Sequence, residues 1–208
     1  CYASGARTGE QLGFEEICRL IDQSIESGGH YLTISGGEPL LRKDINQILT
    51  YASDKLETVL LTNGTLIDEA MARFLSYLNV YLQISLDGMN SPIHDGIRGA
   101  GTFQQTMTAI ELLLALNMQK KLVLSISVMR SNLEEVPKLI EFALQTGIPQ
   151  VNMRPVVAQG NALLNWKQIN PTPDDYARLF DEIYPLFFEH RRELLIQGCL
   201  ADFIFGTL

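Results

Sequence analysis

Residues 31–39 read YLTISGGEP, a short apolar run followed by two glycines, an acid and a proline. An apolar run of this length that is bounded by turn residues is typical of a buried strand. Before it, apolar residues from Phe14 to Ser27 follow a helical stripe, and after it Asp44 can cap a helix through about Ser53. The stretch therefore predicts one strand between two helices.

The same alternation continues along the rest of the chain. Four more extended runs are expected at 57–62, 80–86, 122–129 and 150–156, and helices at 68–78, 102–117, 132–147 and 172–190. Near-continuous apolar strands separated by single helices predict an α/β fold with a parallel sheet and right-handed crossovers. Because no linker divides the chain, we expect one domain over residues 1–192, and residues 193–208 could begin an extension.

One connection between the expected elements is much longer than the others. It runs from Asp87 to Gly101, contains four glycines, and ends where Thr102 and Gln105 have the spacing of a capping box. A structureless loop of this length in a compact domain is more often functional than decorative. Because it follows a strand, we expect it to lie over the carboxyl ends of the strands. Within it, His94 is interpreted as an ordinary loop histidine and Asp87 as a turn residue.

The composition is that of an ordinary globular protein. The chain has 208 residues, 16 Lys and Arg against 24 Asp and Glu, and a formal net charge of −8. This acidic balance disfavours nucleic acid or an anionic membrane as the main partner, since phosphates attract clustered basic residues. No apolar run reaches the length that spans a bilayer. The three cysteines, Cys1, Cys18 and Cys199, are too few for a disulfide framework and favour a reducing, cytoplasmic compartment.

Polar residues stand at the end of every expected strand. In parallel α/β folds ligands bind at the carboxyl ends of strands, so these tips form the candidate site. Strand ends need turn residues in any case, so each tip taken alone leaves both explanations open. The tips are 35–39, 62–64, 85–88, 127–130 and 153–155. Together they favour a site, and Gly36-Gly37-Glu38-Pro39 is the most informative, because two glycines let a ligand approach the main chain beside an acid.

The order of these motifs resembles one known family. Cys1-Tyr2, SGGEPL at 35–40, LTNGT at 61–65 and ISLDG at 84–88 are similar to the motifs of the radical S-adenosylmethionine (radical SAM) enzymes. The stretch from His94 to Phe103 resembles the subgroup with a C-terminal auxiliary-cluster (SPASM-type) domain, which includes peptide-modifying maturases and haem-modifying enzymes. The resemblance covers essentially residues 1–160.

The resemblance implies a partial (β/α)6 TIM-like barrel that holds a 4Fe-4S cluster on three cysteines spaced C-x3-C-x2-C. Cys1 matches the last of the three, so the other two, with the first strand, would precede it. Cys18 falls on the apolar stripe of an expected helix and is interpreted as a buried structural thiol. The implied reaction is reductive cleavage of S-adenosylmethionine to a 5′-deoxyadenosyl radical, which abstracts hydrogen from a peptide or tetrapyrrole-type substrate.

The resemblance also implies a group of cofactor-binding residues at the strand tips. They are Gly36, Gly37, Glu38 and Pro39 around the ammonium group of S-adenosylmethionine, Asn63 near the reacting centre, Ser85 facing the ribose, and Ser127, Arg130 and Met153 toward the carboxylate or the adenine. Arg98 would bind a carboxylate or hold the long connection in place.

The expected partners are a peptide or small-molecule substrate and an electron donor such as flavodoxin or ferredoxin, with neither nucleic acid nor membrane. Two other interpretations stay open. One is a noncatalytic barrel that has lost the cluster and serves as a binding or scaffold module, which the presence of two more cysteines upstream of Cys1 would contradict. The other is an unrelated phosphate-binding barrel, which needs a glycine-rich loop that opens a helix, and Gly160-Asn161 matches this poorly.

Overall fold

The sheet is the centre of the molecule, and all of its strands are parallel. The computed structural model describes residues 11–198. Within them six strands pair in chain order, each with the next. They are β1 (Tyr31–Ile34), β2 (Glu57–Thr62), β3 (Val80–Ser85), β4 (Leu122–Val128), β5 (Gln150–Pro155) and β6 (Leu195–Gln197). The expected α/β class with a parallel sheet is confirmed.

Side chains alternate between the two faces of the sheet, and one face makes the core. Leu60, Leu82 and Leu122 lie in register on β2, β3 and β4, and all three are fully buried. They belong to one apolar cluster that the helices complete. Their neighbours Gln83 and Val123 point the other way and are only half-buried. We call this second face, opposite to the helices, the inner face.

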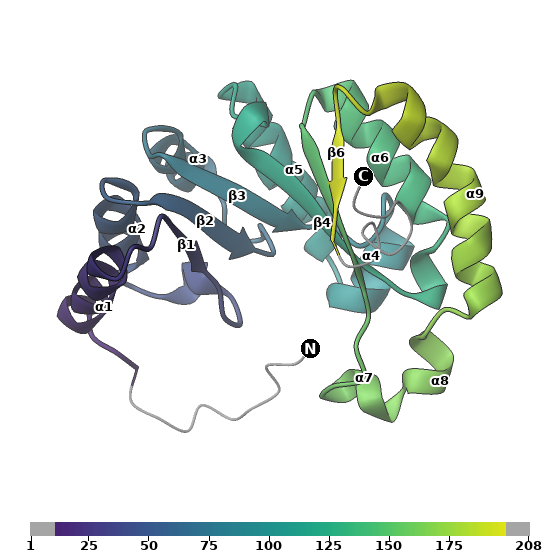
Figure 1. Cartoon of the computed structure of the whole chain (residues 1–208), viewed down its shortest axis with the longest axis horizontal. Helices are drawn as coiled ribbons and strands as arrows, with labels where there is room; N and C mark the ends of the chain where they lie inside the picture. Colours follow the sequence, from purple (N-terminus) through teal and green to yellow (C-terminus); the bar gives the residue numbers. More distant parts are fainter. Residues whose placement is uncertain (1–10, 199–208) are drawn as a thin grey trace.

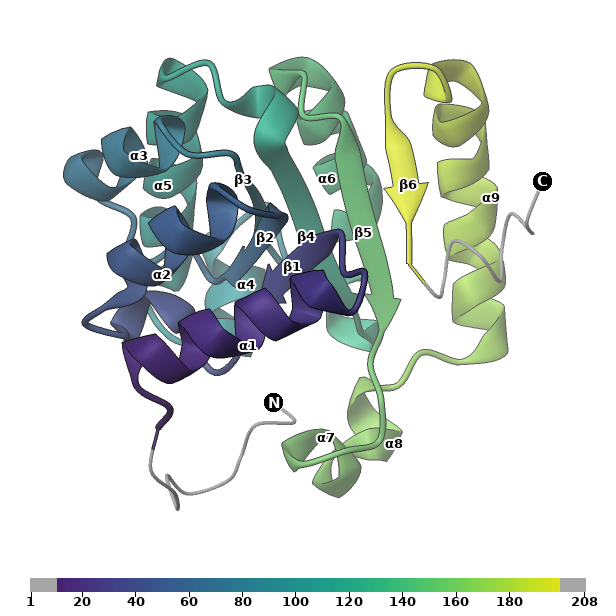
Figure 2. The same ribbon diagram turned by 60° about the vertical axis from the view of Figure 1, so that its left-hand side comes forward.

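Figure 1 shows the sheet curved around its inner face, with helices along the outer side. The helices are α1 (Phe14–Glu26), α2 (Ile45–Ser53), α3 (Glu69–Ser76), α4 (Ser91–Arg98), α5 (Thr102–Ala115), α6 (Glu135–Thr146), α7 (Asn161–Leu164), α8 (Trp166–Ile169) and α9 (Pro173–His190). The short helices α7 and α8 lie below the carboxyl end of β5, and α9 stands beside β6 (Figure 2). Within the described range, no helix combines the length and apolar character that crossing a membrane requires.

The last strand of the sheet is not predicted by the sequence. The first five strands lie where the apolar runs place them, but β6 lies beyond residue 192. The N–H of Leu195 donates a hydrogen bond to the carbonyl of Pro149 at 2.8 Å, and β6 then pairs along β5. Of its three residues only Ile196 is buried. Such a short alternation is too brief to distinguish a strand from a loop.

The long connection after β3 contains a helix rather than a structureless loop. In α4 the side chain of Asn90 accepts a hydrogen bond from the N–H of Ile93 at 3.0 Å, which makes Asn90 the N-cap. A proline stands in the first turn, as is common at helix starts. Gly96 interrupts the apolar pattern, so the short helix is not visible in the sequence.

The capping box expected at Thr102 and Gln105 is wrong, because the cap of α5 comes from the preceding helix. Gly101 is the N-cap residue, and the carboxylate of Asp95 accepts hydrogen bonds from the N–H of Gly101 at 2.8 Å and of Phe103 at 2.7 Å. A hydrogen bond from the Ser91 hydroxyl and those two N–H groups lower the pKa of Asp95 to about 2. The carboxylate therefore ties α4 to α5.

Two glycines should respond in opposite directions to the same substitution. Gly64 has φ 79°, and an added Cβ would lie 3.4 Å from Cγ2 of Ile84. Gly64→Ala should lower the free energy of unfolding by about 1–2 kcal/mol, since left-handed backbone disfavours a Cβ. Gly96 lies inside α4 with open space around it, so Gly96→Ala should raise stability by about 0.5–1 kcal/mol. Urea unfolding of both variants checks this, and equal effects would contradict it.

Candidate functional site

Glu38 links the ends of two strands at the carboxyl edge of the sheet, and we call such a link through one carboxylate a tie. Its Oε1 accepts hydrogen bonds from the Thr62 hydroxyl at 2.8 Å and the Leu40 N–H at 3.1 Å, and its Oε2 accepts one from the Asn63 N–H at 2.8 Å. Thr62 ends β2, so this carboxylate joins the ends of β1 and β2. Pro39 begins the 3-10 turn that Glu38 caps. A carboxylate offers about four acceptor positions, so Glu38 retains one for a further donor.

Open space lies next to this carboxylate. A Cβ placed on Gly36 or on Gly37 would have no heavy atom within 4 Å. On the other side, Oδ1 of Asn63 accepts hydrogen bonds from the N–H and the hydroxyl of Thr65 at 2.9 and 2.8 Å. The oxygen of Asn63 is therefore used inside its own turn, while the main chain of the two glycines is accessible to an approaching group.

A second tie, made by Asp87, joins the ends of β3 and β4. Its carboxylate is 1% exposed, and it accepts hydrogen bonds from Nε of Arg98 at 2.6 Å and from the N–H of Ser127 at 2.7 Å. The amide of Asn132 donates to the carbonyls of both Asp87 and Ser127 at 2.9 and 3.0 Å. A buried carboxylate is stable only when it is paired and hydrogen-bonded. Arg98 and the end of α4 are therefore held over the ends of β3 and β4.

This arrangement confirms that the long connection lies at the carboxyl edge, where Arg98 is paired with Asp87. The Arg98 side chain is 27% exposed, and within residues 11–198 Nε is the only guanidinium nitrogen with a hydrogen-bond partner. Its two terminal nitrogens can therefore donate to a ligand. The interpretation of Asp87 as a turn residue is wrong, since it is the buried centre of the tie.

His94 supports the Asp87 tie from within the protein. It is fully buried, and its Nδ1 accepts a hydrogen bond from the N–H of Asp87 at 3.2 Å. Nε2 is also buried and has no hydrogen-bond partner in the described part of the chain. Burial, and then the charge of Arg98, lower the pKa of His94, although Asp87 and Asp95 act in the opposite direction. The interpretation as an ordinary loop histidine is therefore wrong.

The carboxyl edge thus carries an acid at the β1–β2 end and a guanidinium at the β3–β4 end. A family model for the radical SAM superfamily matches residues 1–143 of this chain. The chain belongs to the radical SAM superfamily. The family expected from the motifs is confirmed.

The relatives to which this chain is similar are enzymes. The chain is 33% identical over 190 residues to the AdoMet-dependent heme synthase of Methanosarcina barkeri, an alignment that covers 90% of this chain and 52% of the relative. It is 28% identical over 201 residues to the PqqA peptide cyclase of Granulibacter bethesdensis, covering 95% of this chain and 52% of the relative. The chain spans about half the length of these relatives.

A solved structure supports the expected partial barrel. The chain is similar to anSMEcpe with bound AdoMet and Kp18Cys peptide, with a TM-score of 0.77 and 20% sequence identity, over 99% of this chain and 62% of that one. The six-stranded sheet is thus the open, partial barrel of the radical SAM fold, and the fold class expected from the sequence is confirmed.

Several residues expected at the radical SAM site do lie together. Glu38 bonds directly to the main chain of Asn63. Ser85 and Ser127 are half-buried on the inner face of β3 and β4, where Ser85 lies in register with Ser125. The main chain of Ser127 reaches Arg98 through Asp87.

Two residues expected at the site point elsewhere. The Met153 side chain is fully buried in the apolar core, on the helix side of β5, so only its main chain could meet a ligand. Arg130 donates to the carbonyl of Asn170 at 2.9 Å and lies 3.9 Å from the carboxylate of Asp175 at the start of α9. The Met153 side chain enters the core because polar and apolar residues alternate along β5, and Arg130 lies beyond the end of β4. A contact of either residue with the cofactor stays a prediction.

Only one of the three cysteines, Cys18, lies in the part of the chain that the structure describes. Cys1 and Cys199 lie outside the described residues. Cys18 is half-buried on α1, where burial and then the charge of Asp22 raise the pKa of its thiol, against a lowering by Lys55. Among residues 11–198 no group of three or more His, Cys, Asp or Glu could bind a metal ion.

Removing the charge of Asp87 should be costly. Asp87→Asn keeps the shape but presents an amide group to Arg98 or to the Ser127 N–H, so one of the two bonds is lost and the guanidinium loses its counter-charge. We expect a loss of about 3 kcal/mol in the free energy of unfolding. The control is Arg73→Gln, which breaks the exposed pair with Glu69 and should cause no measurable change. Similar losses in both variants would argue against a special role for Asp87.

His94 should make the fold sensitive to acid. Because its folded pKa is lowered, the unfolded chain binds a proton that the folded one refuses, and stability falls as pH drops below about 6.5. His94→Asn keeps an acceptor for the Asp87 N–H but cannot titrate, so its melting temperature should fall less between pH 7 and pH 5. His30→Asn, at an exposed position, should keep the wild-type slope. If the melting temperature of His94→Asn fell with pH as steeply as that of wild type, His94 would not be the source of the acid sensitivity.

Proposed function

We propose that the protein is a radical SAM enzyme that binds S-adenosylmethionine at the carboxyl edge of the sheet and acts on a peptide. The observation that supports this most directly is Glu38, whose carboxylate has an unused acceptor position beside the open main chain of Gly36 and Gly37. That carboxylate would accept a charge-assisted hydrogen bond from the cofactor's ammonium group. When bound, the cofactor and a 4Fe-4S cluster supply one-electron chemistry that no side chain provides.

The other end of the edge suits the rest of an α-amino acid. The free nitrogens of Arg98 would donate to the carboxylate of S-adenosylmethionine, with Ser127 beside it. Ser85, on the inner face, would donate to the ribose, and Asn63 would lie near the reacting centre through its amide nitrogen. The two acid-centred ties hold these opposite charges apart, which is what a zwitterionic ligand needs.

The cluster would be held by thiolates, and we propose Cys1 as one of three. Cys18 is a poor substitute, because metal binding needs the thiolate and the pKa of Cys18 is raised. The residues that carry the remaining ligands would lie before Cys1. An electron donor such as flavodoxin or ferredoxin would supply the electron.

The relatives' names support a peptide substrate. One relative is a peptide cyclase, and a structure with the same fold was solved with a peptide bound. A tetrapyrrole is a second candidate, because the heme synthase is the relative at 33% identity. The noncatalytic scaffold remains the rival from a different class.

Anaerobic reconstitution of the full-length protein with iron and sulfide separates the enzyme from the scaffold. The enzyme should show the absorption and electron spin resonance of a 4Fe-4S cluster, and after reduction it should release 5′-deoxyadenosine from S-adenosylmethionine. A full-length protein that binds no iron, or whose cluster leaves S-adenosylmethionine intact under reduction, would refute the proposal and favour the scaffold.

Glu38→Gln tests the carboxylate itself. The variant loses the charge that attracts an ammonium group, so S-adenosylmethionine should bind about tenfold more weakly. Because Glu38 also accepts three hydrogen bonds within the protein, a lowered melting temperature is expected as well. Glu57→Gln is the matched control, since Glu57 is exposed at the opposite, amino end of β2; its affinity and melting temperature should match wild type. An unchanged affinity in Glu38→Gln, with only the melting temperature lowered, would remove Glu38 from the ligand site.

A further inference from the structure

The inner face of the sheet carries a connected chain of side-chain amides. Asn152 donates to Oε1 of Gln83 at 2.9 Å, and Gln150 donates to Oδ1 of Asn152 and Oε1 of Gln197, both at 2.8 Å. The chain thus crosses from β3 to β6 and we call it the amide chain. The amide nitrogens of Gln83 and Gln197 and the oxygen of Gln150 have no partner within residues 11–198. Donors and acceptors therefore remain for a ligand with amides of its own.

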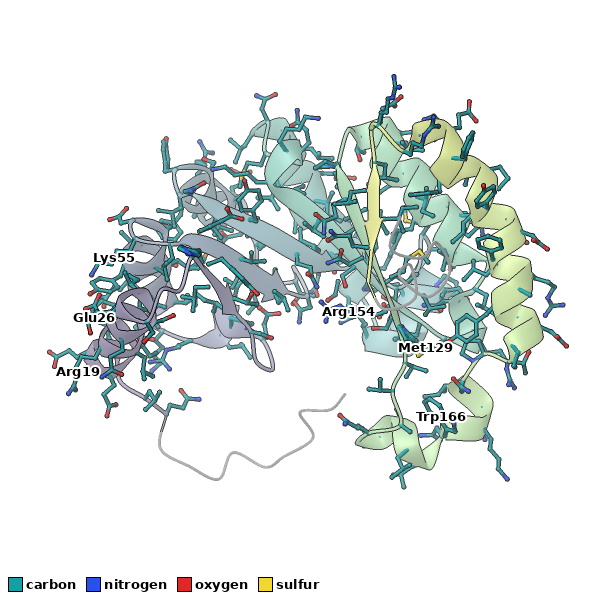
Figure 3. All side chains as sticks on the ribbon, in the orientation of Figure 1. Arg19, Glu26, Lys55, Met129, Arg154 and Trp166 are labelled. Carbon is teal, nitrogen blue, oxygen red and sulfur yellow. The ribbon has the colours of Figure 1, made fainter. Side chains whose placement is uncertain are left out.

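Arg154 lies on the same face, nearer than the amide chain to the carboxyl ends of the strands. It follows Asn152 by two residues on β5 and lies in register with Ser127 on β4, so all three side chains share the inner face. Figure 3 shows Arg154 at the lower ends of the strands, on the inner side of the curved sheet. It is exposed and makes no hydrogen bond or ion pair with the described residues.

Arg154 carries the only positive charge in the six strands. Of all residues in the six strands only Glu57 and Arg154 are charged, and they lie at opposite ends of the sheet, Glu57 first in β2 and Arg154 near the end of β5. A ligand that covers the inner face removes water from the guanidinium. That loss is unfavourable unless the ligand brings an anion, and the planar guanidinium fork matches a carboxylate.

We propose that Arg154 is a specificity-determining residue that binds a carboxylate of the substrate, an acidic side chain of a peptide whose main chain lies over the amide chain. The proposal rests on the proposed function and names the substrate class, a peptide with an Asp or Glu beside the reacting position. Side-chain amides and serines suit a peptide main chain better than the apolar face of a macrocycle. The same carboxylate chemistry could come from S-adenosylmethionine, so the test separates the two sources.

The test uses the full-length protein labelled with 15N-arginine and two capped tripeptides, acetyl-Ala-Glu-Ala-amide and acetyl-Ala-Gln-Ala-amide. The readout is the side-chain Nε–H signal of Arg154, assigned by its absence in Arg154→Lys. The glutamate peptide should shift this signal to saturation, more weakly at high salt, and the glutamine peptide should bind about tenfold less tightly. In Arg154→Gln, where this signal is absent and binding is measured by titration calorimetry, the glutamate peptide should bind about tenfold more weakly, while the affinities for the glutamine peptide and for S-adenosylmethionine should be unchanged.

Arg19→Gln is the matched control, because Arg19 is exposed on the outer helix α1 (Figure 3) and should affect none of the three ligands. Equal responses to both peptides, or no saturable shift, would overturn the proposal. A tenfold loss of S-adenosylmethionine affinity in Arg154→Gln would assign the carboxylate to the cofactor instead. Arg154-dependent binding of coproporphyrin III without a response to either peptide would overturn the peptide assignment. The peptide titration needs neither the cluster nor S-adenosylmethionine. A protein that fails to bind the cluster or S-adenosylmethionine would therefore refute the proposed function without deciding the role of Arg154.

Discussion

The buried carboxylate of Asp87 is the constraint on which the carboxyl edge depends. Burying a charge in a protein interior costs on the order of several kcal/mol unless partners replace the hydrogen bonds that water supplied. Here the partners of the carboxylate come from two different elements, Arg98 from α4 and the Ser127 main chain from β4, while Asn132, from the turn that follows β4, donates to the main-chain carbonyl of Asp87. Satisfying one charge therefore sets the position of a helix and two strand ends at once.

Glu38 also links two strand ends through its carboxylate, at the other end of the edge, but it is less buried than Asp87. It too follows one strand and accepts hydrogen bonds from the end of the next, but it is only half-buried and open space lies beside it. Full burial makes Asp87 a structural acid. Partial exposure lets Glu38 combine a structural role with an unused acceptor position, so the same residue can be needed for the fold and for a ligand.

How far the sequence predicts this arrangement depends on which property is asked for. Strand positions, element order and the polar tips follow from local apolar patterns, and these are confirmed for five strands. The faces of Met153 and Arg154 also follow, because polar Asn152 and Arg154 alternate with apolar Val151 and Met153 along β5. The direction of Arg130 does not follow, because this residue lies beyond the end of β4 and contacts Asn170 and Asp175, which are distant in the sequence. Tertiary partners are likewise invisible: the α5 cap comes from Asp95 in another helix, and β6 depends on β5 for its hydrogen bonds.

The division of the sheet into two faces separates stability from recognition. The outer face buries a continuous apolar cluster against the helices, and that burial is the main favourable contribution to folding. The inner face contributes less, since many of its residues are polar and most are only partly buried. Substitutions there can change what the barrel binds without removing core packing. The amide chain has an intermediate position, because its hydrogen bonds order side chains from β3, β5 and β6 while leaving donors free. A face that is ordered before it binds loses less side-chain entropy when a ligand arrives, and this favours the inner face, rather than the loops, as the place where the substrate is selected.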